Sequence, residues 1–191
     1  MRCQSCHALS WDVICEHCKK TLLTPTVTKR NAGALEVISL FKYSTIEPFL
    51  LTKHTAAGYR IYRYFSKTFF RPFLAEFAGH LDEPVTLIGI DEQVTHGYSH
   101  TAVLSHDAAQ ERIRPAYATL LAHNPVSYAG KPLQYRLDHP RDFRYTGQPG
   151  LEVILIDDII TTGITLQQAQ QVLMQHDVEV LFALTLADAR G

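Results

Sequence analysis

Along the second half of the chain, continuous apolar runs alternate with segments whose apolar residues recur at helical spacing. Apolar runs lie at residues 85–90, 151–157 and 178–186, and the four residues before Asp157 are all apolar. Runs without polar alternation are typical of strands buried on both faces, as in a parallel sheet. Between the last two runs, apolar residues recur at helical spacing from about Thr165, which predicts a helix. Strand, helix and strand in succession predict a βαβ unit and an α/β fold.

The rest of the chain has a less regular pattern. Residues 35–43 and 46–51 have the composition of two strands, which predicts a hairpin around residues 44–45. A helix is predicted from about Ala56 and is interrupted or restarted near Pro72, because proline removes a helical hydrogen bond.

The middle of the chain predicts one further helix, from about Thr101. Residues 117–121 and 133–137 predict short strands, and the segments around them that contain Pro and Gly predict loops.

Two carboxylates, Asp157 and Asp158, directly follow the apolar residues of one run. A turn of small residues comes next and then a helix begins, so free backbone N–H groups and the positive end of the helix dipole point at one place. Gly163 permits close approach of a phosphate to the backbone, and threonine hydroxyls add donors. The predicted phosphate-binding loop comprises Thr161, Thr162, Gly163, Ile164 and Thr165.

The two carboxylates do not suit a phosphate, because like charges repel. They suit sugar hydroxyls or a divalent cation that prefers oxygen ligands. Phosphate donors on one side and paired acceptors on the other fit a ribose 5-phosphate. The alternative interpretation is a buried strand with an acidic end, followed by an ordinary capped helix.

Residues 1–30 contain all four cysteines, as two Cys-x-x-Cys pairs separated by eight residues. Each pair presents two sulfurs from one turn, and two such turns complete a tetrahedral zinc site. Four thiolates fill the coordination shell, so the predicted site is structural and the metal supplies folding energy to a segment without its own core. Disulfides are the alternative, and the neighbouring His7 and His17 could each replace a thiolate. The predicted ligands are Cys3, Cys6, Cys15 and Cys18.

The formal net charge of −1 conceals an asymmetry along the chain. Residues 1–80 carry 11 Lys and Arg against 5 Asp and Glu, whereas residues 81–191 carry 7 against 14. A basic first half indicates an anionic partner.

Four basic residues of the first half share one stripe of the predicted helix. No acidic residue lies between Glu47 and Glu76 to compensate their charge, which favours a phosphate backbone as partner. Of the 18 Phe and Tyr residues, 11 lie between Phe41 and Phe77, and exposed aromatic rings stack with the bases of single strands. The alternatives are a solvated helix face and pairing with carboxylates of the acidic half. The predicted DNA contacts are Arg60, Arg63, Lys67 and Arg71.

Residues 153–165 resemble the thirteen-residue signature of the type I phosphoribosyltransferases, in which four hydrophobic residues precede two acidic residues and a Thr-Thr-Gly phosphate loop. A four-cysteine knuckle at the N-terminus, followed by this signature, is similar to the ComF family of competence proteins. ComFC-type members are implicated in handling DNA during natural transformation. The resemblance implies a zinc finger at residues 1–30 and a phosphoribosyltransferase-like domain at residues 31–191, with a parallel sheet flanked by helices.

The same resemblance implies roles for the acidic pair and the loop. Asp157 and Asp158 would hold the ribose hydroxyls of phosphoribosyl pyrophosphate, directly or through Mg²⁺, and the loop would hold its 5-phosphate. Lys42 and Lys53 are candidates for binding the pyrophosphate, chosen on charge alone. Purine-salvage enzymes of this fold often carry Asp and Lys at two loop positions that are Thr161 and Ile164 here, and this difference disfavours a 6-oxopurine substrate.

The middle of the chain departs from the family pattern. His96-Gly97-Tyr98-Ser99-His100 stands where the family usually carries Arg-Gly-Phe-Asn-Gln, so no pyrophosphate role is transferred to this loop. Gln134, Leu137 and Arg141 loosely match a second family pattern.

Three functional hypotheses follow from these patterns. The first is a DNA-handling competence protein that binds phosphoribosyl pyrophosphate or a related nucleotide, together with single-stranded DNA and other competence proteins. The second is an active phosphoribosyltransferase of nucleotide salvage. The third is a zinc-containing regulator of transcription that senses a nucleotide. Fold alone does not decide among them.

The composition is that of a soluble globular protein, with 46% hydrophobic and 19% charged residues. No apolar run approaches the roughly 20 residues that span a bilayer. Polar residues and cysteines begin at once, which disfavours a signal peptide. These features predict a cytoplasmic protein without a transmembrane segment.

Overall fold

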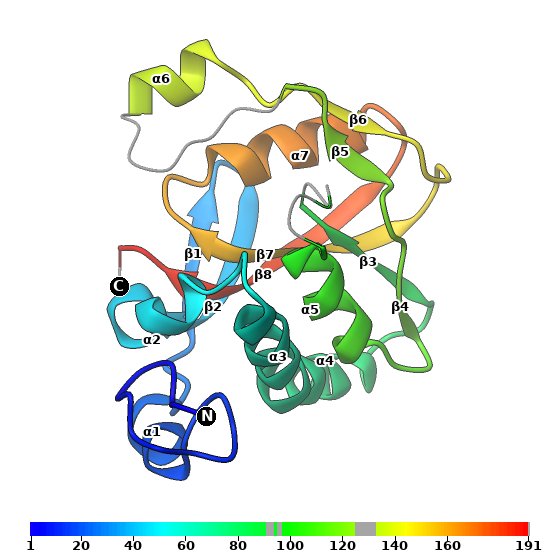
Figure 1. Ribbon diagram of the computed structural model, residues 1–191. Helices are drawn as coiled ribbons and strands as arrows, with labels where there is room; N and C mark the ends of the chain where they lie inside the picture. Colours follow the sequence, from blue (N-terminus) through cyan, green and yellow to red (C-terminus); the bar gives the residue numbers. More distant parts are fainter. Residues whose placement is uncertain (91–93, 95–96, 125–132, 191) are drawn as a thin grey trace.

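The computed structural model describes residues 1–90, 94, 97–124 and 133–190. Within these residues, one six-stranded sheet has the strand order β1-β2-β8-β7-β3-β4 (Figure 1). Every neighbouring pair is parallel except β1 and β2. This arrangement confirms the predicted α/β class with a mostly parallel sheet. The strands are β1 (Thr28–Ala32), β2 (Leu35–Lys42), β3 (Val85–Gly89), β4 (Ile113–Pro115), β7 (Glu152–Ile160) and β8 (Glu179–Asp188).

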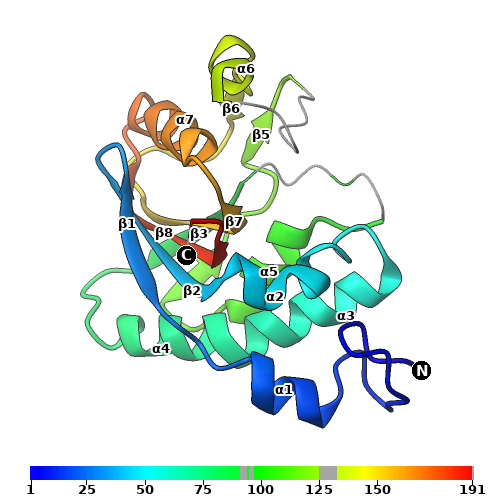
Figure 2. The ribbon, with the colours of Figure 1, turned by 90° about the vertical axis from the view of Figure 1, so that its left-hand side faces the viewer.

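Helices cover both faces of the sheet (Figure 2). One face packs against α2 (Tyr43–Leu50), α3 (Ala56–Phe65), α4 (Arg71–Ala78) and α5 (His100–Ala108), with a π-helical turn at Ser66–Phe70 between α3 and α4. The other face packs against α7 (Ile164–Met174) and the small antiparallel sheet of β5 (Leu120–Ala122) and β6 (Phe143–Tyr145). The short helix α6 (Leu133–Asp138) precedes β6.

Strand β7 shows why a continuous apolar run is needed at the centre. Ile154 and Ile156 belong to the core beneath α2–α5, whereas Val153 and Leu155 belong to the core beneath α7. Both sets are fully buried, so no position of the run meets water.

Several predicted elements are confirmed, and two strands are wrong. The helix from Ala56, the helix near Thr101 and the strands at residues 85–90, 151–157 and 178–186 all appear, with shifted ends. Residues 46–51 lie mainly in helix α2, because Ile46, Phe49 and Leu50 bury one helical face. The real hairpin joins β1 to β2.

The second wrong strand is at residues 133–137, which form α6. Short segments of this kind are ambiguous between helix and strand from periodicity alone. The strand predicted at residues 117–121 is also displaced, since β5 begins at Leu120.

The N-terminal segment packs against the same core as α3 (Figure 2). Its helix α1 (Glu16–Leu22) carries the second cysteine pair at its start, with Cys15 as the N-cap residue and Cys18 in the first turn. Val13, Ile14 and Leu23 are buried in one cluster with Ile61 and Phe65 of α3. Among the residues that the structure describes, no helix has the length and apolar character required to cross a membrane.

Candidate functional site

Asp157 and Asp158 lie near the carboxyl end of β7, and the strand continues past them to Ile160. Neighbouring side chains of a strand point to opposite faces. Asp158 is buried, at 4% exposure, on the face covered by α3 and α5, where it meets side chains of both helices. Asp157 is only partly buried. The two carboxylates therefore occupy different environments although they are adjacent in sequence.

Asp158 is surrounded by three donors from separate elements. Its Oδ2 lies 3.2 Å from Lys53 Nζ, accepts a hydrogen bond from the Tyr62 hydroxyl at 3.0 Å, and lies 3.7 Å from His100 Nε2. Burial by itself raises the pKa of Asp158. The positive charges of His100 and Lys53 and the hydrogen bonds from Lys53 and Tyr62 outweigh burial and hold this pKa well below its ordinary value. Asp158 is thus an ionised internal partner for Lys53.

Asp157 behaves in the opposite way. Although the residue as a whole is only partly buried, desolvation of its carboxyl group, and next the charge of Asp158, raise the pKa of Asp157 well above its ordinary value. Its Oδ1 accepts a hydrogen bond from the backbone N–H of Asp158 at 2.8 Å. Ligand atoms of His100, Asp157 and Asp158 lie within 4.8 Å of one another. A divalent cation beside Asp157 would offset the repulsion between the two carboxylates, and a sugar hydroxyl would stabilise the charged carboxylate by donating a hydrogen bond to it.

The predicted phosphate loop connects β7 to α7. Gly163 has φ +85° and immediately precedes the helix. A Cβ atom built on Gly163 would lie 2.6 Å from Cβ of Ala32, so both the backbone conformation and the space require glycine. Gly163 occupies the cap position and has no side chain to offer the helix, and the Thr162 hydroxyl accepts a 3.4 Å hydrogen bond from Ile164 N–H. The first turn of α7 can therefore present backbone N–H groups to an anion.

Arg30 is a residue of this site that the sequence pattern did not reveal. From edge strand β1, its Nη2 donates to the carbonyl oxygen of Thr161 at 2.6 Å, and its Nε lies 2.7 Å from Oδ2 of Asp188. Its side chain is 18% exposed. Arg30 thus ties the phosphate loop to the ends of β1 and β8. No local spacing could have found it, because its two partners lie far along the chain.

The two lysine candidates lie at the same edge of the sheet, with different surroundings. Lys42 is exposed at the end of β2, level with Asp188 of β8. Lys53 follows α2, and the carboxylate of Asp158 raises its pKa. The loop at residues 96–100 is described only from Gly97, so His96 lies outside the described residues.

The basic stripe has acidic partners that lie outside the segment between Glu47 and Glu76. Arg63 Nε lies 2.7 Å from Oδ2 of Asp107, a buried carboxylate on α5. Lys67 lies 3.9 Å from the same carboxylate, and Arg60 lies 3.5 Å from Asp12 of the N-terminal segment. The expectation of a stripe without counter-ions is therefore wrong for these three cations.

Arg71, the fourth member of the stripe, is exposed at the start of α4. Whether the stripe meets DNA stays a prediction. Of the aromatic residues near it, Tyr62 is buried against Asp158, whereas Tyr59 is 41% exposed.

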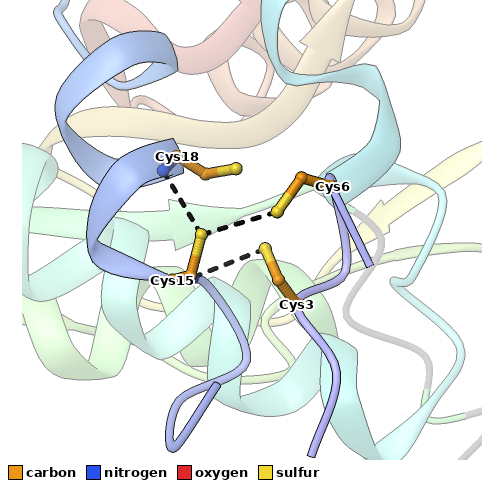
Figure 3. A group of neighbouring side chains, drawn as sticks. All are labelled: Cys3, Cys6, Cys15 and Cys18. Atoms are coloured by element: carbon orange, nitrogen blue, oxygen red, sulfur yellow. Dashed lines mark hydrogen bonds between the residues drawn. The ribbon is translucent and has the colours of Figure 1, made fainter. Parts of the chain in front are cut away.

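The four cysteines converge on one point, as Figure 3 shows. All are free thiols, and their sulfur atoms lie within 4.8 Å of one another. Sγ of Cys6 and Sγ of Cys15 are 3.6 Å apart, close to the roughly 3.8 Å edge of a tetrahedron with Zn–S bonds of about 2.3 Å. Backbone N–H groups of Cys15 and Cys18 donate to Sγ of Cys3 and Cys15, both at 3.4 Å.

This donor set fits zinc both in chemistry and in geometry. Burial, and next the hydrogen bonds with the neighbouring thiols, raise the pKa of Cys18 to about 12, so ionising this thiol costs free energy when no cation lies beside it. A Zn²⁺ ion would remove that penalty, and four sulfur ligands leave no open coordination position.

Comparison of the sequence with protein-family models found no match, and neither did comparison with curated proteins. Solved structures similar to this chain include a hypoxanthine phosphoribosyltransferase from Staphylococcus aureus, with 15% identity over 66% of this chain and a TM-score of 0.43. This chain spans 64% of that protein's length, which is slightly less than two thirds.

Two other similar structures are matched over more of their length. A phosphoribosyltransferase from Corynebacterium diphtheriae has 14% identity over 90% of this chain and 81% of its own, with a TM-score of 0.42. The adenine phosphoribosyltransferase from Saccharomyces cerevisiae has 12% identity over 90% of this chain and 88% of its own, with a TM-score of 0.45. Values this low establish neither a family nor an activity.

Proposed function

We propose that this protein binds phosphoribosyl pyrophosphate, or a related nucleotide, together with Mg²⁺ at the carboxyl end of β7. The observation that carries this proposal is the junction of β7 and α7. There, an uncapped helix N-terminus and the left-handed Gly163 follow within a few residues of a carboxylate whose pKa is raised. Phosphate donors and a hydroxyl acceptor thus lie next to each other, as a ribose 5-phosphate requires.

The residues divide the ligand between them. The loop at residues 161–165 binds the 5-phosphate through backbone N–H groups and threonine hydroxyls, and Arg30 holds that loop in place. Asp157 accepts hydrogen bonds from the ribose hydroxyls or binds Mg²⁺, which when present neutralises the phosphate oxygens.

Asp158 has a different task from Asp157 in this proposal. Its carboxylate is already engaged by Lys53 and Tyr62, so it orients Lys53 rather than meeting the sugar directly. Lys53 and the exposed Lys42 then supply positive charge for the pyrophosphate. Of the two acidic residues of the motif, Asp157 therefore contacts the ligand, and Asp158 acts indirectly by orienting Lys53.

For the biological role, we infer that this protein handles DNA during natural transformation. The support is the resemblance to the ComF family at both ends of the chain, together with the basic stripe on α3 and α4. Single-stranded DNA is the proposed polymer ligand, and the four cysteines hold a structural zinc ion beside α3. The alternative of an active salvage transferase gains no support from the residues that the structure describes, because they show no evident group for recognising a base.

Calorimetry with phosphoribosyl pyrophosphate and Mg²⁺ tests the ligand proposal. Asp157→Asn should weaken binding at least about tenfold, because it removes a charged acceptor worth about 1.5–3 kcal/mol. Glu152→Gln is the matched control, since Glu152 is exposed at the opposite end of the same strand. Equal affinity of the parent and Asp157→Asn, or no heat of binding by the parent, would refute the assignment.

A further inference from the structure

A pocket of about 240 Å³ lies between α3 and α5, lined by residues of both helices and by the loop before α5. It is distinct from the site at Asp157. Tyr98 and Ser99 line this pocket, whereas the next residue, His100, faces Asp158. Its other walls include Tyr59, Arg63, Val103, Asp107 and Tyr117, and we call it the tyrosine pocket.

Three tyrosine rings form much of its wall. The rings of Tyr59 and Tyr98 meet edge to face, with centroids 5.5 Å apart. The Tyr98 hydroxyl donates to the carbonyl oxygen of Thr55 at 3.2 Å, and the Tyr117 hydroxyl lies 2.9 Å from Nδ1 of His106. These contacts hold the rings of Tyr98 and Tyr117 in place through their hydroxyl groups. Tyr59 and Tyr117 remain 41% and 46% exposed, so their rings are accessible to a ligand.

Arg63 contributes a flat polar surface beside these rings. Its guanidinium lies 5.7 Å from the centre of the Tyr59 ring. Two hydrogen bonds to Asp107, at 2.7 and 3.4 Å, hold the guanidinium plane in one orientation. Because Asp107 neutralises its charge, Arg63 is better suited to stacking than to pairing with a phosphate. Aromatic rings and guanidinium planes are the surfaces on which unstacked nucleobases lie.

The surroundings of the pocket add charge of the right sign. Arg60 and Lys67 are about half exposed on the same helical segment as Tyr59 and Arg63. Their ion pairs with carboxylates, at 3.5 and 3.9 Å, are longer than the 2.7 Å pair of Arg63, so they keep more capacity to meet a phosphate. The pocket is smaller than the roughly 300–1,000 Å³ of sites for drug-sized ligands, so its occupant is a single ring system. A base inside and phosphates on the flanking cations satisfy both features.

We propose that the tyrosine pocket binds one nucleobase of a single-stranded nucleic acid whose phosphates lie along Arg60 and Lys67. This inference rests on the DNA-binding part of the proposed function, and it adds a defined base-stacking site. Stacking is tolerant of sequence, because every base has a π-face. The pocket should therefore distinguish strands with bases from strands without them.

The test measures, by fluorescence anisotropy, the affinity for a short oligothymidylate and for a strand of the same length made of abasic sites. Tyr59→Leu should weaken binding of the oligothymidylate about 5- to 150-fold, the range expected for loss of one stacked base. Tyr59→Phe keeps the ring and should bind as the parent does. Tyr135→Ala, on the distant helix α6, is the aromatic control and should also bind normally (Figure 1).

The outcomes separate the pocket from the proposed function. Equal affinity of the parent for both oligonucleotides, or no effect of Tyr59→Leu, would overturn the pocket and leave DNA binding through the backbone intact. If neither oligonucleotide binds, the DNA-handling function fails and the nucleic-acid inference fails with it. Thymidine monophosphate is then titrated, and binding that depends on Tyr59 would assign the pocket to a free nucleotide instead. Binding of phosphoribosyl pyrophosphate should be unchanged in Tyr59→Leu, which also shows that the variant is folded.

Discussion

Lys53 and Asp158 form an ion pair of 3.2 Å across 105 positions of sequence. The pair joins a lysine after α2 to a carboxylate inside β7, and the buried Tyr62 adds a hydrogen bond to the same oxygen. Its consequence is that two adjacent acidic residues of one motif have opposite effects on stability. Asp158 stabilises the fold while Asp157 opposes it in the ligand-free protein.

The first prediction concerns these two residues at neutral pH. Asp158→Asn should lower the free energy of unfolding by about 1–2 kcal/mol, because Lys53 and Tyr62 lose a charged partner. The cost stays at the low end because the Lys53 side chain is 33% exposed and can regain water. Asp157→Asn should leave stability unchanged or raise it, since it removes a repelled charge. Denaturant unfolding measures both, and equal destabilisation by the two changes would contradict the prediction.

The second prediction concerns the pH dependence of unfolding. Asp158 has a lower pKa in the folded protein than its ordinary 3.8, so its contribution is complete above about pH 4 and is lost as the pH falls further. Asp157 has a raised pKa in the folded protein, so stability falls as pH rises from about 4 through that pKa. Asp157→Asn should therefore flatten the profile above about pH 4, and Asp158→Asn should flatten it mainly below. The measurement is the free energy of unfolding of the parent and both variants across a pH series. If both variants altered the same pH range of the profile, the assignment would be refuted.

The third prediction concerns Arg30. Arg30→Lys should weaken binding of phosphoribosyl pyrophosphate about tenfold, because one ammonium cannot reproduce the planar fork that contacts both Thr161 and Asp188. Lys29→Gln is the control, since Lys29 is its exposed neighbour on β1 and pairs only at the surface with Glu36. Calorimetry measures the affinity. An unaffected Arg30→Lys variant would show that the loop keeps its shape without this contact.

The fourth prediction concerns the cysteine cluster. Elemental analysis should give about one zinc per chain, and chelation should lower the thermal midpoint of the whole protein. A separately folding finger would leave the rest intact, but here Val13, Ile14 and Leu23 share a core with α3, so loss of the metal also exposes that helix. Cys15→Ser should have the same effect as chelation. Metal-free protein with two disulfides would contradict the zinc assignment.

The fifth prediction concerns the stripe and its counter-ions. Four unpaired cations on a single strand would make log affinity fall with log salt at a slope near −3, whereas Asp107 and Asp12 should reduce this to about −1 to −2. Asp107→Asn should raise the affinity for an abasic oligonucleotide and steepen the slope by about 0.7. Glu111→Gln, exposed just after α5, is the control. A slope unaltered by Asp107→Asn would mean that the stripe is a solvated helix face.

The sequence by itself determined the features that depend on neighbouring residues. The apolar run before Asp157 predicted the central strand, because burial on both faces leaves no polar position. Gly163 predicted the turn before α7, since its positive φ is a local property of glycine. The paired spacing of the cysteines likewise predicted two sulfurs on each of two turns. In the structure all four sulfur atoms lie within 4.8 Å of one another.

Only the tertiary structure decided which groups face one another. The pairing of Lys53 with Asp158, of Arg63 with Asp107 and of Arg30 with Thr161 joins segments more than 40 positions apart, so no local spacing encodes it. The helix at Tyr43–Leu50 depended on the same cause, because an apolar segment this short takes its form from the surface it covers. Side-chain partners and short ambiguous segments are settled by packing between distant elements, and that packing is absent from any one stretch of the chain.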